Sequence, residues 1–293
     1  MRRRTLLTLG AAALTATKLA GIADATGEPA AAFAAIEKDS GGRLGVYARN
    51  TGSGASLSYR GDERFPMCST FKVLAVSAVL QRVDRGQERL DRSIPYGKTD
   101  LLAYAPVTTA HVAEGALSVS QLCEAAIVVS DNTAANLLLR TLGGPQAVTA
   151  FVRARPFDDT ITRLDRIEPA LNSAIPGDPR DTTAPAKMAH DLGILLTTRE
   201  ALSEASSRRL ANWMYACETG LDALRAGVPS TWIAGDKTGS GANGTQNDVA
   251  IFRRPRRAPL VVAAYLTGAS HLTHEERSTA LARVGRIVAA TLS

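Results

Sequence analysis

The stretch Ser69-Thr70-Phe71-Lys72 begins a run of apolar residues that continues to Val83. The run is hydrophobic nearly all round, which is typical of a helix buried inside a domain. Because Lys72 lies three residues after Ser69, the two side chains would share one face of this helix. Ser69 would stand at the helix N-terminus, where unpaired N–H groups and the dipole stabilise a developing negative charge. The pattern suits nucleophilic catalysis, although a solvated Ser–Lys pair at a helix start looks the same.

A second motif, Ser130-Asp131-Asn132, separates two helical segments that we expect over residues 118–129 and 133–142. Serine, aspartate and asparagine are all good helix N-caps, so this motif is compatible with a plain cap. It also brings a hydroxyl and an amide to the end of a helix, where they can face a ligand.

A third motif, Lys237-Thr238-Gly239, follows a strand-like segment over residues 232–237. The glycine permits close approach of the backbone to a ligand, and the alternative is a hairpin with a polar edge. Each of the three motifs is weak evidence alone. Together, in this order, they supply the hydroxyl and ammonium groups that acyl transfer through a serine ester requires.

Helical and strand periodicity both vanish between residues 163 and 183, which hold seven charged residues and three prolines. So long an irregular segment in a domain is usually functional, and its alternating charges could pin its ends together. Glu168 and Asn172 lie inside it. A carboxylate that activates water and a nearby amide that holds the water are what hydrolysis of an ester needs.

Strand patterns occur at both ends of the chain, and helical patterns lie between them. We therefore expect an α/β (α+β) fold, in which an antiparallel sheet built from both ends is flanked by helices. We divide the chain into a discontinuous α/β domain of residues 26–62 and 213–293 and an all-α domain of residues 63–212, whose active-site loop spans residues 163–181. The expected helices span 29–39, 71–83, 118–129, 133–142, 185–217 and 273–291, and the expected strands 43–49, 56–60, 232–237, 248–252 and 260–266.

The N-terminus has the pattern of an export signal. Arg2-Arg3-Arg4 precedes an apolar stretch that runs to Ala16, and residues 23–25 form an A-x-A cleavage site. The paired arginines favour the twin-arginine route, with an uncleaved anchor or a disordered tail as the alternatives. We predict that residues 1–25 are a signal peptide and that the mature protein is periplasmic or secreted. No later run of eighteen apolar residues occurs, so we expect no membrane contact after cleavage.

Composition excludes several classes of partner. The full chain carries a net charge of +6, and it falls to +3 without residues 1–25. The densest remaining basic run, residues 253–257, has no interleaved aromatic residues and is typical of a solvated hairpin tip, so we expect no nucleic-acid partner. The three cysteines and four histidines do not cluster, which favours neither a metal site nor any cofactor.

These motifs resemble those of the class A serine β-lactamases, and the resemblance runs from about residue 30 to the C-terminus. The S-x-x-K, S-D-N and K-T-G set is shared by these enzymes and the penicillin-binding proteins. The resemblance implies the serine β-lactamase/D,D-peptidase-like fold and a monomer that needs no cofactor. It implies small-molecule β-lactams as substrates, clavulanate-type inhibitors and a role in β-lactam resistance. Three further segments carry it: residues 64–68, 104–108 and 175–183.

The resemblance also implies roles in catalysis. Ser69 looks like the acylated nucleophile, and its own N–H with that of Ser240 would form the oxyanion hole. Either Lys72 or Glu168, acting through water, would be the base for acylation. Ser130 would pass a proton to the departing lactam nitrogen, with assistance from Lys237.

The implied substrate-binding residues surround these groups. Tyr104 resembles the aromatic wall of the cleft, and Asn132 resembles the residue that binds the substrate's side-chain amide. Arg225 stands where some members keep a carboxylate-binding arginine, with a surface helix arginine as the alternative. The remaining implied contacts are Asn172 with the hydrolytic water, and Lys237, Thr238, Gly239 and Ser240 with the substrate carboxylate.

Some positions differ from the family pattern. Ile167 and Ala170 replace the tryptophan and glutamate of many relatives. Family disulfides that use Cys68 or Cys123 would need partners where Gly241 and Val76 stand, so we expect no intramolecular disulfide. A penicillin-binding D,D-peptidase and a non-catalytic β-lactam sensor remain alternatives, and Glu168 with Asn172 favours the β-lactamase.

Overall fold

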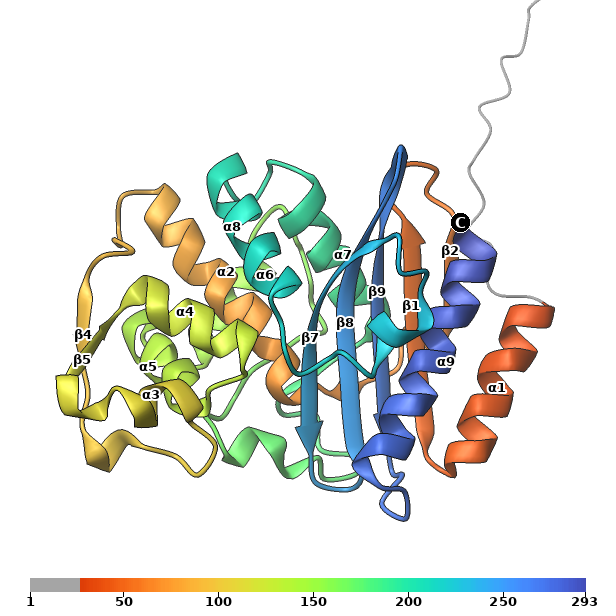
Figure 1. Ribbon diagram of the computed structural model, residues 1–293, viewed down its shortest axis with the longest axis horizontal. Helices are drawn as coiled ribbons and strands as arrows, with labels where there is room; N and C mark the ends of the chain where they lie inside the picture. The colour runs from red at the N-terminus through yellow and green to blue at the C-terminus, as the bar shows by residue number, and fades with distance from the viewer. Residues whose placement is uncertain (1–26) are drawn as a thin grey trace, which may run out of the picture.

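The two ends of the chain meet in one five-stranded antiparallel sheet of strand order β2-β1-β9-β8-β7 in the computed structural model, which describes residues 27–293 (Figure 1). β1 pairs with β9 from Arg43 opposite Thr267 to Asn50 opposite Leu260. The expected antiparallel sheet from both ends of the chain is therefore confirmed. Its strands are β1 (Arg43–Asn50), β2 (Ser56–Tyr59), β7 (Ile233–Gly241), β8 (Thr245–Arg254) and β9 (Arg257–Thr267).

The central strand β9 separates two hydrophobic cores. Side chains of a strand alternate between the two faces of a sheet. Val261 and Tyr265 accordingly pack in the core shared with the helical region, whereas Val262 and Leu266 pack on the opposite face. That opposite face is covered by α1 (Glu28–Ser40) and α9 (His274–Leu292), which lie together at the same side of the sheet (Figure 1). Because both faces are covered, β9 is apolar along nearly its whole length.

The helical region is built around α2 (Phe71–Asp84), whose residues from Phe71 to Leu80 are all buried. This confirms the helix that the apolar run predicted. Around it lie α3 (Pro106–Ala110), α4 (Val119–Val128), α5 (Asn132–Leu142), α6 (Gln146–Arg153), α7 (Pro185–Thr197) and α8 (Glu204–Tyr215). Short elements complete the chain: strands β3 (Phe65–Pro66), β4 (Ser93–Pro95), β5 (Ala116–Ser118) and β6 (Thr182–Thr183), and 3-10 turns η1 (Cys68–Thr70), η2 (Lys98–Asp100), η3 (Val112–Glu114), η4 (Ala170–Ser173) and η5 (Leu224–Gly227).

Several element boundaries differ from the sequence prediction, and two of these differences affect the helix count and the third motif. The helix expected over 185–217 is two helices, because Ser203 caps a new helix by accepting the N–H of Ser206. The third motif lies within β7 and not after it, since pairing with β8 continues to Gly241. Sequence periodicity did not indicate these last strand residues because they alternate small and polar side chains.

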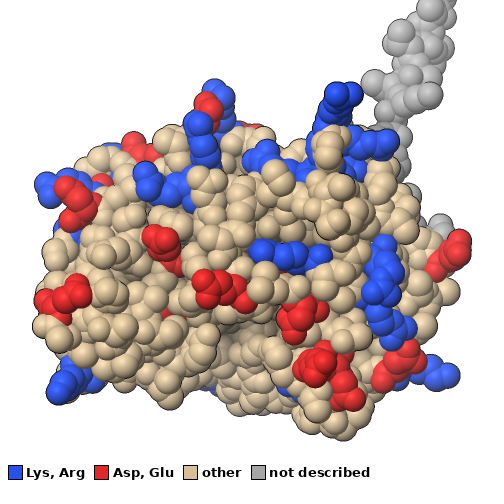
Figure 2. Space-filling view, viewed as in Figure 1, with Lys and Arg blue, Asp and Glu red and all other residues tan. Residues whose placement is uncertain are grey.

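Further expectations concern the surface and the cysteines. The predicted signal peptide, residues 1–25, lies outside the described residues. No helix within residues 27–293 is long and apolar enough to cross a membrane. The basic run at 253–257 spans the end of β8, the turn and the start of β9, so the expected hairpin is confirmed, but Arg254 is buried and not solvated. Side chains of both charges occur across the face shown in Figure 2. The three cysteines are buried and unpaired.

Candidate active site

Ser69 lies in the 3-10 turn η1, which leads directly into α2. The amide of Asn247 on β8 anchors this turn by donating to the carbonyls of Pro66 (2.8 Å) and Met67 (3.1 Å). β7 passes close by, and a Cβ at Gly239 would stand 2.8 Å from the Met67 carbonyl and 3.1 Å from the Ser69 nitrogen. Any larger residue at this position would push the strand away from the turn, which explains the glycine of the third motif.

Lys72 lies one turn into the helix and is completely buried. Its Nζ donates to the Ser130 carbonyl (2.8 Å), the Ser130 hydroxyl (3.2 Å) and Asn132 Oδ1 (2.6 Å). It also forms an ion pair with Glu168 at 3.2 Å. Burial lowers the pKa of Lys72 to about 8, although the Glu168 charge opposes this effect. The lysine thus joins three of the predicted site residues.

Lys237 of β7 reaches the same serine from the other side. Its Nζ donates to Ser130 Oγ at 2.9 Å and to the Thr238 carbonyl at 2.8 Å. The Ser130 hydroxyl therefore lies between two ammonium groups. Burial also lowers the pKa of Lys237. This arrangement suits a hydroxyl that relays a proton, because two cations stabilise its deprotonated form.

Asp131 fixes the second motif in place. One carboxylate oxygen caps α5 by accepting the Ala134 N–H at 2.8 Å, and the other accepts the N–H groups of Val107 (3.0 Å) and Thr108 (2.9 Å). Asn132 N–H in turn donates to the Tyr104 carbonyl at 3.1 Å. The cap therefore also holds the segment that carries Tyr104 against the cleft. The interpretation of this motif as a helix cap is confirmed for Asp131. The cap leaves the side chains of Ser130 and Asn132 available for other roles.

Glu168 lies under Ser69, and its side chain is completely buried. Ser69 Oγ donates to Glu168 Oε1 at 3.2 Å, and Asn172 Nδ2 donates to Oε2 at 2.5 Å. The backbone of Glu168 is held on both sides by Asn136, whose amide donates to its carbonyl (2.9 Å) and accepts its N–H (2.9 Å). Within residues 27–293 the buried Oδ1 of Asn172 has no hydrogen-bond donor. That oxygen is free to accept a hydrogen bond from a water at the Glu168 carboxylate.

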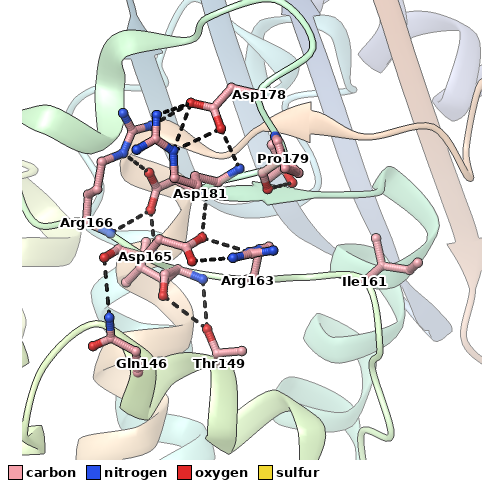
Figure 3. Close-up of polar contacts among 12 residues, drawn as sticks. Gln146, Thr149, Ile161, Arg163, Asp165, Arg166, Asp178, Pro179 and Asp181 are labelled. Carbon is pink, nitrogen blue, oxygen red and sulfur yellow. Dashed lines mark hydrogen bonds and ion pairs between the residues drawn. The ribbon is translucent and has the colours of Figure 1, made fainter.

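The loop that carries Glu168 is closed at its base by ion pairs (Figure 3). Arg166 Nε pairs with Asp181 Oδ2 at 2.5 Å, and Asp181 Oδ1 accepts the N–H groups of Asp165 (2.7 Å) and Arg166 (2.9 Å). Arg163 pairs with Asp165 at 2.6 Å. The alternating charges therefore do tie the two ends of the irregular segment together, as the sequence predicted.

These groups surround a cavity of about 510 Å³. Tyr104 stands at its rim with 52% of its surface exposed. Lys72, Lys237 and Glu168 lie beneath the floor. The predicted site residues that line the cavity are Ser69, Tyr104, Ser130, Asn132, Asn172, Thr238, Gly239 and Ser240. Within residues 27–293, no three side chains of His, Cys, Asp or Glu gather as a metal ion would require.

Comparison with known proteins agrees with this geometry. A family model described as the β-lactamase enzyme family matches residues 28–292. β-Lactamase L2 of Stenotrophomonas maltophilia is 45% identical over 98% of this chain and 97% of its own length. An ancestral class A β-lactamase superposes with a TM-score of 0.87 at 55% identity, over 90% of this chain and 99% of that one. The chain belongs to the class A serine β-lactamases. β-Lactamase CTX-M-8 of Citrobacter amalonaticus is also similar, at 46% identity over 87% of this chain and 86% of its own length.

One predicted residue of this class A β-lactamase does not point to the cleft. Arg225 Nη2 forms an ion pair with Asp236 Oδ1 at 2.5 Å and bonds the Met214 carbonyl at 3.4 Å. Asp236 is completely buried and needs a cation, since an unpaired buried carboxylate is costly. Arg225 lies in the short helix η5, in keeping with the alternative of a surface helix arginine, and its ion pair with the buried Asp236 gives it a structural role in place of the expected carboxylate-binding one.

Three residues of the site were missed in the sequence of this β-lactamase. Thr219 and His274 line the cavity, and Thr219 shares a hydrogen bond of 2.6 Å with Thr238. Both come from segments far from the motifs along the chain, and no local pattern indicates them. Asn136 could have been found, because it lies in the helix predicted over 133–142 and four residues after Asn132, which places it one turn from the second motif.

Proposed function

We propose that this β-lactamase opens its substrate by attack of Ser69 Oγ and releases the product with a water activated at Glu168. One observation carries this proposal. Glu168 Oε1 lies 3.2 Å from Ser69 Oγ and 3.2 Å from Lys72 Nζ, while Asn172 holds the other carboxylate oxygen. A single carboxylate thus reaches both the nucleophile and a place for water beside it.

In the acylation step, the Ser69 hydroxyl loses its proton to the neutral amine of Lys72, and Glu168 acting through a water is the second route. Burial lowers the pKa of Lys72 to about 8, which makes the neutral amine accessible, and hydrogen bonds hold its Nζ beside Ser130 and Asn132. The first route remains open when Glu168 is replaced. The carbonyl oxygen of the substrate then becomes negative. It would be stabilised by the N–H groups of Ser69 and Ser240, since such donors act most strongly on the charge of the transition state.

Collapse of the tetrahedral intermediate breaks the C–N bond of the lactam, and the nitrogen needs a proton. Ser130 Oγ supplies it in our proposal. The contacts of Ser130 with Lys72 (3.2 Å) and Lys237 (2.9 Å) support this, because either ammonium can replace the proton that the serine gives up.

Substrate binding would use the rest of the cleft. We assign the substrate carboxylate to Thr238 and Ser240, with the charge of Lys237 beneath them. Gly239 has no side chain, so their strand can lie close to the turn that carries Ser69. The side-chain amide of the substrate would bond Asn132, and Tyr104 would cover one side of the ring. Arg225 has no part in this scheme because Asp236 already holds it.

Deacylation distinguishes this proposal from a penicillin-binding D,D-peptidase or a β-lactam sensor. A water bound between Glu168 and the free Oδ1 of Asn172 would lie beside the ester of Ser69. Glu168 removes a proton from this water as it attacks, so the ester is hydrolysed and Ser69 is regenerated. Without this pair the acyl-enzyme would persist.

Several properties of the whole molecule are proposed with the activity. Residues 1–25 would direct export by the twin-arginine route to the periplasm or the outside of the cell. The mature enzyme would act as a monomer and be inhibited by clavulanate-type compounds. Residues 26–62 with 213–293, and residues 63–212, would form the two domains whose junction is the cleft.

The test of this mechanism is Glu168→Ala. We expect it to acylate with nitrocefin or penicillin in a stoichiometric burst and then to turn over at least about a thousandfold more slowly than wild type. Intact-mass measurement should find the acyl-enzyme accumulated. Glu200→Ala removes an exposed glutamate and serves as the control, with wild-type turnover expected. Hydrolysis at the wild-type rate by Glu168→Ala would overturn the mechanism.

A further inference from the structure

A second cavity, of about 490 Å³, lies behind the loop 163–181 and shares no lining residue with the catalytic cleft. One wall comes from the loop itself and the opposite wall from the α1–β1 turn, the start of β1 and the residues around β3. The short helix η4 separates the two cavities. Leu171 of η4 lines the second cavity, and the next residue, Asn172, lines the cleft. The volume is within the range of small-molecule sites.

The charged side chains that line this cavity are mostly positive. Four arginines and one carboxylate contribute: Arg43 and Arg64 from the body, and Arg166, Arg180 and Asp178 from the loop. Hydrogen bonds from Arg180 hold the pKa of Asp178 down at about 2, so this carboxylate remains charged. Glu63 pairs with Arg43 at 2.9 Å and Asp181 pairs with Arg166, so Arg64 is the lining arginine that has no carboxylate partner among residues 27–293.

Arg64 is the arginine with the most unused binding capacity. Within residues 27–293 it forms no ion pair. Among the described residues, its side chain makes hydrogen bonds only through Nη1, to the Ile161 carbonyl (2.7 Å) and Thr182 Oγ1 (3.1 Å). Its Nε and Nη2 donors remain available, and these two nitrogens form the fork that binds a carboxylate or phosphate in two parallel hydrogen bonds.

The two arginines that the loop contributes to the cavity, Arg166 and Arg180, both interact with Asp178. Arg166 pairs with Asp181 at 2.5 Å and lies 3.7 Å from Asp178, which also pairs with Arg180 at 2.8 Å (Figure 3). One carboxylate is therefore divided between two guanidinium groups. A second anionic group placed here would complete the coordination of Arg166 and Arg180 without breaking the pair that closes the loop.

The lining also includes apolar residues, among them Pro66, Leu171 and Ile175. We propose that this cavity is a binding site for a small organic polyanion, with one acidic group on Arg64 and another on the loop arginines. The carbon skeleton of the ligand would lie against the apolar residues of the lining. A monovalent anion can reach one wall only, so the site should select polycarboxylates over simple salts.

Citrate is a suitable probe, with acetate at the same ionic strength as the comparison. We expect saturable citrate binding by titration calorimetry in the absence of any β-lactam, and a citrate-dependent rise in Tm that acetate does not reproduce. Because no substrate is present, the result is independent of the hydrolytic mechanism. An equal response to acetate and citrate would overturn the proposal.

Substitutions locate the binding. Arg64→Gln and Arg180→Gln should each weaken citrate binding by about tenfold or more, which is the effect of losing one good charge-assisted contact. Arg64→Lys keeps the charge but loses the fork and should be intermediate. Arg89→Gln, at an exposed arginine remote from the cavity, is the matched control. Since Arg64 also holds Ile161, each variant is compared with and without citrate. Wild-type citrate affinity in both glutamine variants would refute the site.

Discussion

The two walls of the catalytic cleft are held in place by different forces. Ser69, Lys72 and Lys237 belong to a helix start and a strand, and they are fixed by packed secondary structure whose side chains are buried. Glu168 and Asn172 belong to a loop whose regular structure around them is the single turn η4. That loop depends on the ion pairs at its base and on the two hydrogen bonds from Asn136. The residues that carry out acylation are therefore positioned by packed secondary structure, and we call them the packed wall. The residues that activate the water are positioned by ion pairs and hydrogen bonds, and we call them the loop wall.

The largest expected effect concerns the packed wall. Lys72→Met keeps the length of the side chain but removes the ammonium that joins Ser130, Asn132 and Glu168. We expect acylation to slow by about 10³ to 10⁴, because Ser69 loses both the amine that accepts its proton and the ammonium that stabilises the negative charge developing on its oxygen. Stopped-flow measurement of the acylation burst would test this.

The control for this change is Lys38→Met, a substitution at a lysine on α1 outside the cleft. Circular dichroism should first establish that Lys72→Met is folded, since the change leaves the Glu168 carboxylate buried without its cation. If Lys72→Met acylates at the normal rate and is slow only in deacylation, the assignment of Lys72 to the packed wall is wrong.

The second expected effect concerns the loop wall. Asp181→Asn keeps the shape of the side chain but removes the charge that pairs with Arg166 at 2.5 Å. Loss of one partner from a buried pair costs about 3 to 5 kcal/mol, and part of this cost would appear as local opening of the loop. We expect deacylation to slow by about ten- to a hundredfold with acylation changed much less. Single-turnover kinetics separates the two steps.

Asp178→Asn is the matched control, since Asp178 is also an aspartate of the loop that pairs with arginine, but on the outer side. It should have the smaller effect on deacylation. Equal slowing of acylation and deacylation by Asp181→Asn would show that the two walls do not act separately.

The comparison of the two walls also explains what the sequence could predict. Ser69 and Lys72 are three residues apart, and the spacing of a helix alone puts them on one face. Asp165 and Asp181 lie among arginines in an irregular segment, so closure by ion pairs followed from charge pattern. Local rules of this kind were enough for the strands, the buried helix and the loop.

Other features depend on contacts between segments far apart in the chain. The two hydrogen bonds that place Ser130 between Lys72 and Lys237 join three separate elements, and only the family resemblance pointed to them. Arg225 was misassigned because the direction of its side chain is set by Asp236, whose burial cannot be read from one sequence. Thr219 and His274 were missed because their positions at the cleft also depend on contacts between segments that are far apart in the chain.

The smallest expected effect lies just before the loop, in a pair of buried carboxyl groups. Asp159 accepts the N–H groups of Ile161 (2.7 Å) and Thr162 (3.1 Å), and its neighbour Asp191 comes from α7. Burial raises the pKa of Asp191 from 3.8 to about 7; His190 opposes the shift, and the nearby Asp159 charge contributes to it. Arg153 lies 3.9 Å from Asp159 on the other side. Asp191 therefore keeps its proton in the folded state at pH values where the unfolded chain has lost it.

This difference fixes the sign of the pH dependence. Between about pH 4 and pH 7 the folded state binds more protons at Asp191 than the unfolded state does, so this residue lowers the stability as pH rises. Asp191→Asn removes that dependence. We expect the Tm of the variant to exceed that of wild type by about 3 °C near pH 8, and the difference to shrink or reverse near pH 5. Scanning calorimetry at the two pH values measures it.

Asp62→Asn, at an exposed aspartate, is the control and should shift Tm equally at both pH values. Deacylation near pH 8 should change little in Asp191→Asn. Its neighbour Asp159 accepts a hydrogen bond from Ile161, which precedes the loop, and the ion pair of Arg166 with Asp181 that closes the loop stays intact. A large change in the deacylation rate would mean that the charges that position the loop wall include Asp191 of α7. A Tm difference that is the same near pH 5 and pH 8 would contradict the raised pKa of Asp191 and leave the loop pairs as the charges that matter.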